Sequence, residues 1–308
     1  MKKIQLFIAL LIITALCKSE LSAQNEIYEK ATFKLTKQAT GHYTLPIVFN
    51  EQTKAEALLE SGIHAMLIDS AFAFNYLNHL NLELTPCTKQ IMNLGGTKYR
   101  ISHRAQVELQ INPSVIFKGE LFLLADFHQT YEVALPIQKI YHAKGKRCIN
   151  LDLRNNAIHV LASCDAPKTK WDTFNINTNT YLNIPAITSE LNFKHPKYDA
   201  TLKGNFNLDL GNASLLFLFN QSKAVQDFLN SQTNIEMQKG YDKKGNLIAQ
   251  AFLPETLNMG NISIDDPVVA ITKFLPKFTT DGCFGIKFFE KKEVIFDFDN
   301  NKLYIKKE

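Results

Sequence analysis

Short apolar runs separated by polar turns fill most of the chain after its first 23 residues. From Ala31 to Phe49 the apolar residues recur at strand-like intervals, and Glu51 to Lys54 has the composition of a turn into the next strand. Asp69 to Leu80 is richer in Ala, Leu and Phe and predicts a short helix, as does Ser222 to Asn230. Frequent short strands with turn punctuation predict an all-β protein with a few short helices.

One apolar run, Ala57 to Asp69, is interrupted by Glu60, Ser61 and Gly62. A charge in such a place is costly unless it is paired or used, because burial penalises the ionised form. Gly62 leaves no side chain in the way of a close approach. An isolated Glu-Ser-Gly would be better explained as a strand-end glutamate turned out to solvent.

A second copy of this arrangement changes the interpretation. Phe206 to Leu218 again places an acid, Asp209, one residue before a glycine, Gly211, between apolar runs. Asp209 follows Glu60 by 149 residues. The two segments therefore predict equivalent positions in two related halves of the chain.

The correspondence between the halves continues downstream. Ile286 follows Ile137 by the same 149 residues, and Asp297 follows Asp152 by 145. An offset that changes by only four residues along the chain indicates a duplication, and the change is explained by an insertion in the first half near His142 to Gly145. Two long copies predict two lobes and not the solenoid that many short repeats would form.

The order of motifs in each half resembles the lobe pattern of pepsin-like and retropepsin-like aspartic peptidases: two apolar residues before Asp-Thr/Ser-Gly, a flap-like hairpin, two apolar residues before Gly, and a final hairpin. The second half carries this order at Leu208–Gly211, Asp281–Gly285 and Val294–Tyr304. Residues 44–307 resemble two fused bacterial retropepsin-like domains. The resemblance implies a bilobal, aspartic-peptidase-like double β-barrel with pseudo-two-fold symmetry.

The resemblance also implies a catalytic pair, Glu60 and Asp209, with Ser61, Gly62 and Gly211 as supporting loop residues. The two carboxyl groups would share one proton, so that one activates water while the other donates to the substrate carbonyl. Each lobe would contribute one acid, and a peptide or protein would bind in the cleft between the lobes.

Three positions depart from the family pattern. Glu60 replaces an aspartate, Leu210 replaces a serine or threonine, and Pro136 stands where the second half has Gly285. The extra methylene of glutamate displaces its carboxyl by about 1.5 Å, and an error near 1 Å can cost on the order of a hundredfold in rate. We therefore expect hydrolysis to be weak or lost. The alternatives are a non-catalytic peptide- or protein-binding module of the cell envelope and a structural envelope or secreted interaction protein.

Thr88 to Arg104 contains a hairpin signal, with Gly95 and Gly96 near its tip. In an aspartic peptidase the flap over the cleft falls about here, which makes this segment the predicted flap. The alternative is an ordinary surface hairpin.

The first residues predict export. Lys2 and Lys3 precede an apolar core, Leu6–Leu16, and a cleavage site before Gln24. The predicted organisation is a signal peptide at 1–23, an N-terminal lobe at 24–165, a linker at 166–180 and a C-terminal lobe at 181–308. Because no later apolar run approaches transmembrane length, we expect a periplasmic or extracellular protein without an integral membrane segment.

The net charge and the histidine and cysteine positions narrow the range of possible functions. The formal net charge is only +4, with both signs interspersed, which gives no basis for nucleic-acid binding. The eight histidines are scattered and no metal or redox spacing occurs, so neither a metal nor another cofactor is predicted. Cys148 and Cys164 flank a predicted hairpin; a disulfide between them and a pair of reduced thiols both remain open. Cys87 and Cys283 have no predicted partner.

Overall fold

The structure is a computed structural model. It describes residues 29–94, 97–127, 129–164, 170–178, 183–232, 234–241, 244, 247–272 and 279–307. The predicted signal peptide, 1–23, and the predicted flap tip, Gly95 and Gly96, lie outside these ranges. In the described part of the chain, no helix combines the length and the apolar character that crossing a membrane requires.

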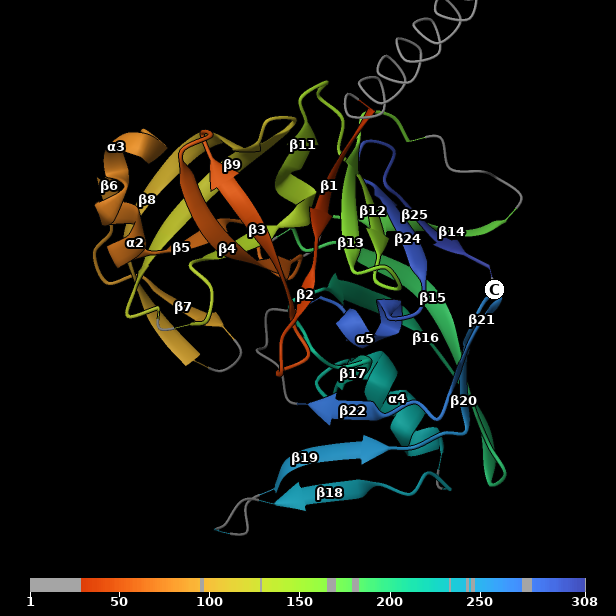
Figure 1. Ribbon diagram of the computed structural model, residues 1–308. Helices are drawn as coiled ribbons and strands as arrows, with labels where there is room; N and C mark the ends of the chain where they lie inside the picture. The colour runs from red at the N-terminus through yellow and green to blue at the C-terminus, as the bar shows by residue number, and fades with distance from the viewer. Residues whose placement is uncertain are drawn as a thin grey trace, which may run out of the picture.

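The first half forms one mixed sheet, on the left in Figure 1, in the order β2-β3-β4-β10-β5-β9-β8-β6, with β11 beside β9 and β7 beside β8. Its strands are β2 (Thr36–Lys37), β3 (Tyr43–Phe49), β4 (Thr53–Glu60), β5 (Met66–Asp69), β6 (Thr85–Pro86), β7 (Ile91–Leu94), β8 (Thr97–Asn112), β9 (Val115–Ala125), β10 (Val133–Pro136) and β11 (Ile140–His142). Its helices are α2 (Ser70–Asn75), α3 (Leu77–Leu80) and the 3₁₀ turn η1 (Ile137–Lys139).

The second half repeats this plan in the lower part of Figure 1. Its strands are β15 (Ala186–His195), β16 (Tyr198–Asp209), β17 (Leu216–Phe219), β18 (Gln238–Tyr241), β19 (Leu247–Phe252), β20 (Thr256–Met259), β21 (Ile262–Asp265), β22 (Val269–Thr272) and β23 (Gly282–Gly285). Its helices are α4 (Lys223–Ser231) and α5 (Ile286–Phe289). Caps explain where the predicted helices start: Asp69 accepts the Phe72 N–H before α2, and Ser222 accepts the Val225 N–H before α4.

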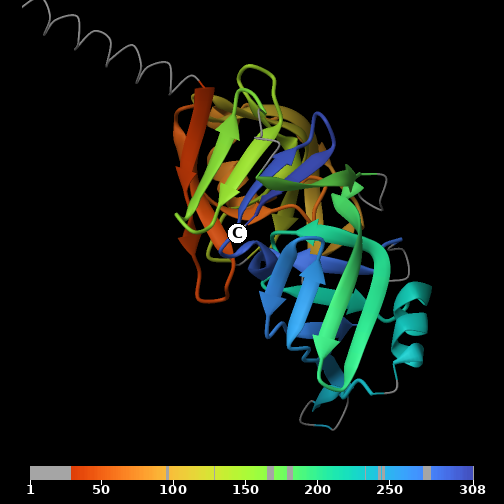
Figure 2. The ribbon, with the colours of Figure 1, turned by 90° about the vertical axis from the view of Figure 1, so that its right-hand side faces the viewer.

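Strands from both halves form a shared antiparallel layer, which lies beside the first half and above the second in Figure 1 and is seen from another side in Figure 2. Its order is β1-β13-β12-β24-β25-β14. Its members are β1 (Lys30–Lys34), β12 (Cys148–Asp152), β13 (Ala157–Leu161), β14 (Trp171–Asn177), β24 (Glu293–Asp297) and β25 (Lys302–Lys306). The first half supplies β1, β12 and β13, and the second half supplies the other three.

The register of this layer places a pseudo-two-fold axis between the halves. β12 pairs with β24 so that Asn150 lies opposite Ile295, and these two residues differ by the same 145 positions as the repeats around them. A residue at one end of β12 therefore pairs with the β24 residue that corresponds to the other end of β12; Cys148, for example, lies opposite Asp297, the counterpart of Asp152. The axis passes through the centre of this strand pair, as a bilobal duplication requires.

The segment that connects the two lobes contains a strand. Residues 171–177 of the predicted linker form β14, which pairs with β25 through Trp171–Asn175 and with β15 through Ile176 and Asn177. Its polar side chains alternate outward, which gives the segment the composition of a linker. The exact lobe boundaries stay a prediction. The predicted insertion near His142 to Gly145 coincides with β11 and its following turn, which follow η1 in the first half.

Both halves share a continuous apolar core. Phenylalanine supplies many of its largest fully buried side chains: Phe49, Phe117, Phe193, Phe206, Phe252, Phe284, Phe288, Phe289 and Phe296. Burying aromatic side chains of this size is a major source of folding free energy. The acid loops are anchored in this core by Leu59, Leu208 and Leu210, all fully buried.

Candidate active site

The two predicted acids occupy equivalent places in the fold. Glu60 ends β4 and Asp209 ends β16. A parallel strand lies beside each: β10 places Pro136 opposite Glu60, and β23 places Gly285 opposite Asp209. The sheets therefore deliver one carboxyl from each half at the end of a buried strand.

The two acid loops meet at one place. A Cβ atom at Gly62 would lie 2.5 Å from Asp209 Oδ1, and a Cβ at Gly211 would lie 1.8 Å from Glu60 Oε2. Each glycine of one loop therefore lies directly against the acid of the other. The close approach itself requires glycine here, because any larger side chain would occupy the space of a carboxyl group.

The extra methylene of Glu60 is accommodated within its own loop. Glu60 Oε1 accepts the N–H of Ser61 at 2.7 Å and that of Gly62 at 2.6 Å. In the second half Asp209 Oδ1 accepts the N–H of Gly211 at 3.1 Å. The longer side chain turns back onto two N–H groups, and its carboxyl still hydrogen-bonds to the Asp209 carboxyl.

The surroundings assign the shared proton to Glu60. Glu60 is only 8% exposed. Burial raises its pKa well above the usual range, and the neighbouring charge and hydrogen bond of Asp209 raise it further. Burial also raises the pKa of Asp209, but the hydrogen bonds from Glu60, the Gly211 N–H and Cys283 oppose that rise. These directions favour a pair that shares one proton, with Glu60 the more readily protonated member.

Ser61 braces the two loops against each other. Its hydroxyl donates to the Leu208 carbonyl at 2.8 Å and accepts the Leu210 N–H at 2.9 Å. The equivalent bond from the second loop to the first cannot form, because Leu210, the counterpart of Ser61, has no hydroxyl; its side chain is fully buried in the core. The interface between the loops therefore has one bracing hydroxyl.

Cys283 is a neighbour of the pair that sequence reasoning did not include among the site residues. It lies on β23, where burial raises the thiol pKa well above the usual range, with Asp209 and Glu60 adding to the effect. The thiol is therefore protonated; it donates to the Phe284 carbonyl at 3.7 Å and lies close enough to Asp209 to influence the pKa of that carboxyl. The sequence signal for it was its position one residue after Gly282 in the Asp281–Gly285 motif.

The predicted flap is a hairpin of β7 and β8, paired from Ile91–Arg100 to Leu94–Thr97. Its base packs on an apolar cluster that includes Leu58 and Ile63, which flank the Glu60 loop. Tyr131 belongs to the same cluster, and burial together with the Glu60 charge raises its pKa to about 12. The hairpin therefore stands beside the first acid loop.

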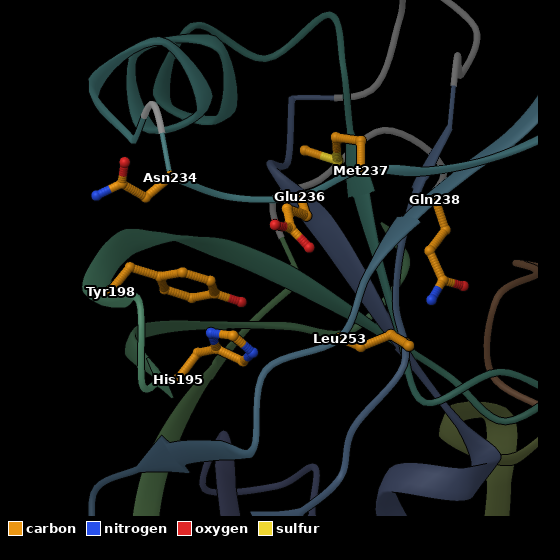
Figure 3. A pocket seen from close by; sticks show the side chains of 7 residues that line it. All are labelled: His195, Tyr198, Asn234, Glu236, Met237, Gln238 and Leu253. Carbon is orange, nitrogen blue, oxygen red and sulfur yellow. The ribbon is translucent and has the colours of Figure 1, made fainter.

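A pocket of about 360 Å³ lies elsewhere in the second half (Figure 3). It is lined by His195, Tyr198, Asn234, Glu236, Met237, Gln238 and Leu253. The rings of His195 and Tyr198 are stacked with centroids 5.0 Å apart. Tyr198 begins β16 and Asp209 ends it, so this pocket is at the opposite end of the strand from the acid pair.

Within the described residues, no group of three or more histidine, cysteine, aspartate or glutamate side chains is placed to hold a metal ion. No protein-family model matches the sequence. No curated protein matches it either.

The fold does have a solved counterpart. An aspartic proteinase from Irpex lacteus superposes with a TM-score of 0.54 at 9% sequence identity, over 90% of this chain and 97% of the proteinase. At this identity the likeness concerns the fold alone. The chain has the bilobal, aspartic-peptidase-like fold that the motif order predicts, and the finer resemblance to fused bacterial retropepsin-like domains stays a prediction.

Proposed function

We propose that the protein is an exported aspartic-type endopeptidase that hydrolyses peptide bonds slowly with the pair Glu60 and Asp209. The observation that carries this proposal is the contact between the two carboxyl groups, one from each half, each backed by the glycine of the other loop. A buried acid pair holding one proton is the arrangement that peptide hydrolysis by two carboxyl groups requires.

In the proposed reaction the ionised Asp209 accepts a proton from water as the water oxygen attacks the peptide carbonyl. Neutral Glu60 donates its proton to the carbonyl oxygen, which gives a tetrahedral diol. Proton transfer to the leaving nitrogen then breaks the C–N bond and returns one proton to the pair. Because each cycle starts from the singly protonated pair, activity should be confined to acidic conditions, between the two macroscopic pKa values.

Two features explain why the proposed reaction is slow. Glu60 Oε1 is held by two backbone N–H groups, which fixes the carboxyl in a position set by a longer side chain. Leu210 removes one of two bracing hydroxyls and leaves that of Ser61, which bonds to the backbone on both sides of Asp209. Small errors in the position of a reacting group have large effects on rate.

The test is proteolysis of a denatured protein and a peptide mixture by the purified protein from acidic to neutral pH. Asp209→Asn should abolish cleavage, whereas Asp199→Asn, an exposed aspartate on the same strand, should leave it unchanged. Glu60→Asp combined with Leu210→Thr restores both family features and should raise the rate. Cleavage that survives Asp209→Asn would refute the proposed chemistry.

The second candidate function is a non-catalytic peptide- or protein-binding module that uses the inter-lobe cleft. It is supported by Leu210, whose burial in the core keeps the loops together without a second hydroxyl. In that case isothermal titration should detect binding of extended peptides, with no cleavage in either the parent or the Glu60→Asp, Leu210→Thr variant.

Export is part of the proposal. The basic and apolar residues at the start of the sequence support it. So does the disulfide between Cys148 and Cys164, because disulfides persist mainly in oxidising compartments. Mass determination of the secreted or periplasmic protein should give a first residue at Gln24; a protein retaining residues 1–23 in the cytoplasm would contradict it.

A further inference from the structure

The two halves support their acid loops in different ways. In the second half, backbone N–H groups of three consecutive residues, 285–287, donate to carbonyls of the loop that follows Asp209. These bonds are Gly285 N–H to Leu215 O at 3.1 Å, Ile286 N–H to Asn212 O at 2.7 Å, and Lys287 N–H to Ser214 O at 3.2 Å. The loop is therefore held directly by main chain.

Glycine makes that main-chain contact possible. A Cβ at Gly285 would lie 2.4 Å from Ser214 O and 2.5 Å from Asn212 O, so the loop approaches to a distance that no side chain would permit. The first half has Pro136 at this position, opposite Glu60 on β10. Proline carries a ring that keeps the loop away and has no N–H to donate.

The backbone after Pro136 also takes another direction. The ψ angle of Pro136 is 113° and that of Gly285 is −176°, so the N–H of Ile137 points in a different direction from that of Ile286. In the described ranges of the chain, no backbone N–H of residues 136–138 donates to a carbonyl of residues 61–66. The support present in the second half is thus missing from the backbone of the first.

The Gln138 side chain supplies hydrogen bonds to the loop carbonyls in place of the missing backbone bonds. Its Nε2 donates to the Ile63 carbonyl at 2.6 Å and to the Ser61 carbonyl at 3.2 Å, and the residue is only 6% exposed. By the offset of 149 residues Ile63 is the counterpart of Asn212, whose carbonyl the Ile286 N–H binds. A side-chain amide therefore holds the carbonyl that a backbone amide holds in the other half.

One peptide group connects this amide to the acid. The Ser61 carbonyl accepts from Gln138, and the N–H of the same peptide group, that of Gly62, donates to Glu60 Oε1 at 2.6 Å. Hydrogen bonds in such a chain orient and polarise one another. The orientation of the Gln138 amide thus fixes the donor that holds the Glu60 carboxyl.

We propose that Gln138 is a positioning residue for Glu60, which replaces through its side-chain amide the loop support that Pro136 removes from the backbone. The proposal rests on the proposed function in that Glu60 is the acid whose position matters. Gln138 acts through the Ser61–Gly62 peptide group and does not itself touch the reacting atoms.

The test replaces Gln138 by methionine, which has a similar length and no N–H donors. The matched control is Lys287→Met, at the equivalent and exposed position of the second half, where the backbone supplies the support. Gln138→Met should lower kcat by about tenfold to a hundredfold with little change in KM. Lys287→Met should leave both constants at the parent values. Circular dichroism and thermal unfolding establish that each variant is folded.

A second measurement does not require catalysis. The Gly62 N–H stabilises ionised Glu60, so weakening that bond should raise the Glu60 pKa further, seen by ¹³C NMR titration of its carboxyl. The other titratable groups that face Glu60 in the described residues, Asp209, Cys283 and Tyr131, are unchanged in the variant. In an active protein the alkaline limb of the pH–rate profile should move to higher pH.

Adding Pro136→Gly to Gln138→Met removes the ring and should let the Ile137 N–H reach the Ile63 carbonyl, as the Ile286 N–H reaches that of Asn212 in the second half. The Glu60 titration should then return toward that of the parent. A Glu60 titration that is the same in the parent and in Gln138→Met would overturn the proposal, and so would an equal effect of Lys287→Met. Because the titration needs no substrate, absence of proteolysis in the parent would count against the proposed function alone.

Discussion

Gly211→Ala is the substitution that most directly challenges the contact between the two loops. The new Cβ would lie 1.8 Å from Glu60 Oε2, whereas ordinary contact begins at 3.4 Å. The carboxyl must therefore move by more than about 1 Å, a displacement that can cost on the order of a hundredfold in rate. It cannot rotate away freely, because the N–H groups of Ser61 and Gly62 hold Oε1.

The assay is kcat/KM for a cleaved peptide at acidic pH, together with the thermal midpoint. Gly240→Ala is the matched control, because its Cβ would meet Ala249 Cβ at 3.5 Å and the Ala249 carbonyl oxygen at 3.9 Å, both ordinary contact distances. We expect a large loss for Gly211→Ala at a thermal midpoint that still shows a folded protein, and no loss for Gly240→Ala. If Gly211→Ala kept the parent kcat/KM and the parent Glu60 titration, the two loops would not be in contact.

Three further predictions concern stability. Ser61→Ala removes the acceptor of the buried Leu210 N–H and should cost about 1–3 kcal/mol in denaturant unfolding; an unchanged midpoint would argue against the brace. Folding raises the Glu60 pKa, so its contribution to stability is present at low pH and lost as pH rises through the folded pKa, and Glu60→Gln should flatten that decline. Cys148→Ser should lower the unfolding free energy by about 3 kcal/mol, as expected for a loop of this size, and equality with the parent would speak against the disulfide with Cys164.

The sequence contained the information that places the acid pair. The offset between Glu60 and Asp209 marks equivalent strand ends, and equivalent positions that lie close to the axis between two fused halves meet across it, as β12 and β24 do. The glycines after each acid indicated a close approach, and the structure places each against the opposite carboxyl. Local pattern and repetition together were sufficient for this part of the fold.

Other features depend on pairings between distant segments, which local pattern does not encode. The shared layer brings β1, β12 and β13 beside strands of the second half, and β14 within it has the polar composition of a linker. The role of Gln138 becomes visible only when the loop carbonyls are located, although Pro136 in place of a glycine already marked a difference between the halves.

The central claim is that Glu60 and Asp209 form one proton-sharing pair. The direct measurement is a ¹³C NMR titration of the Glu60 carboxyl in the parent and in Asp209→Asn, with Glu60→Gln used to assign the resonance. The account predicts that Glu60 titrates well above the usual range for glutamate and that Asp209→Asn lowers this pKa, because the neighbouring charge is removed while burial remains. A Glu60 carboxyl that titrates in the usual range, with the same pKa in both proteins, would contradict it.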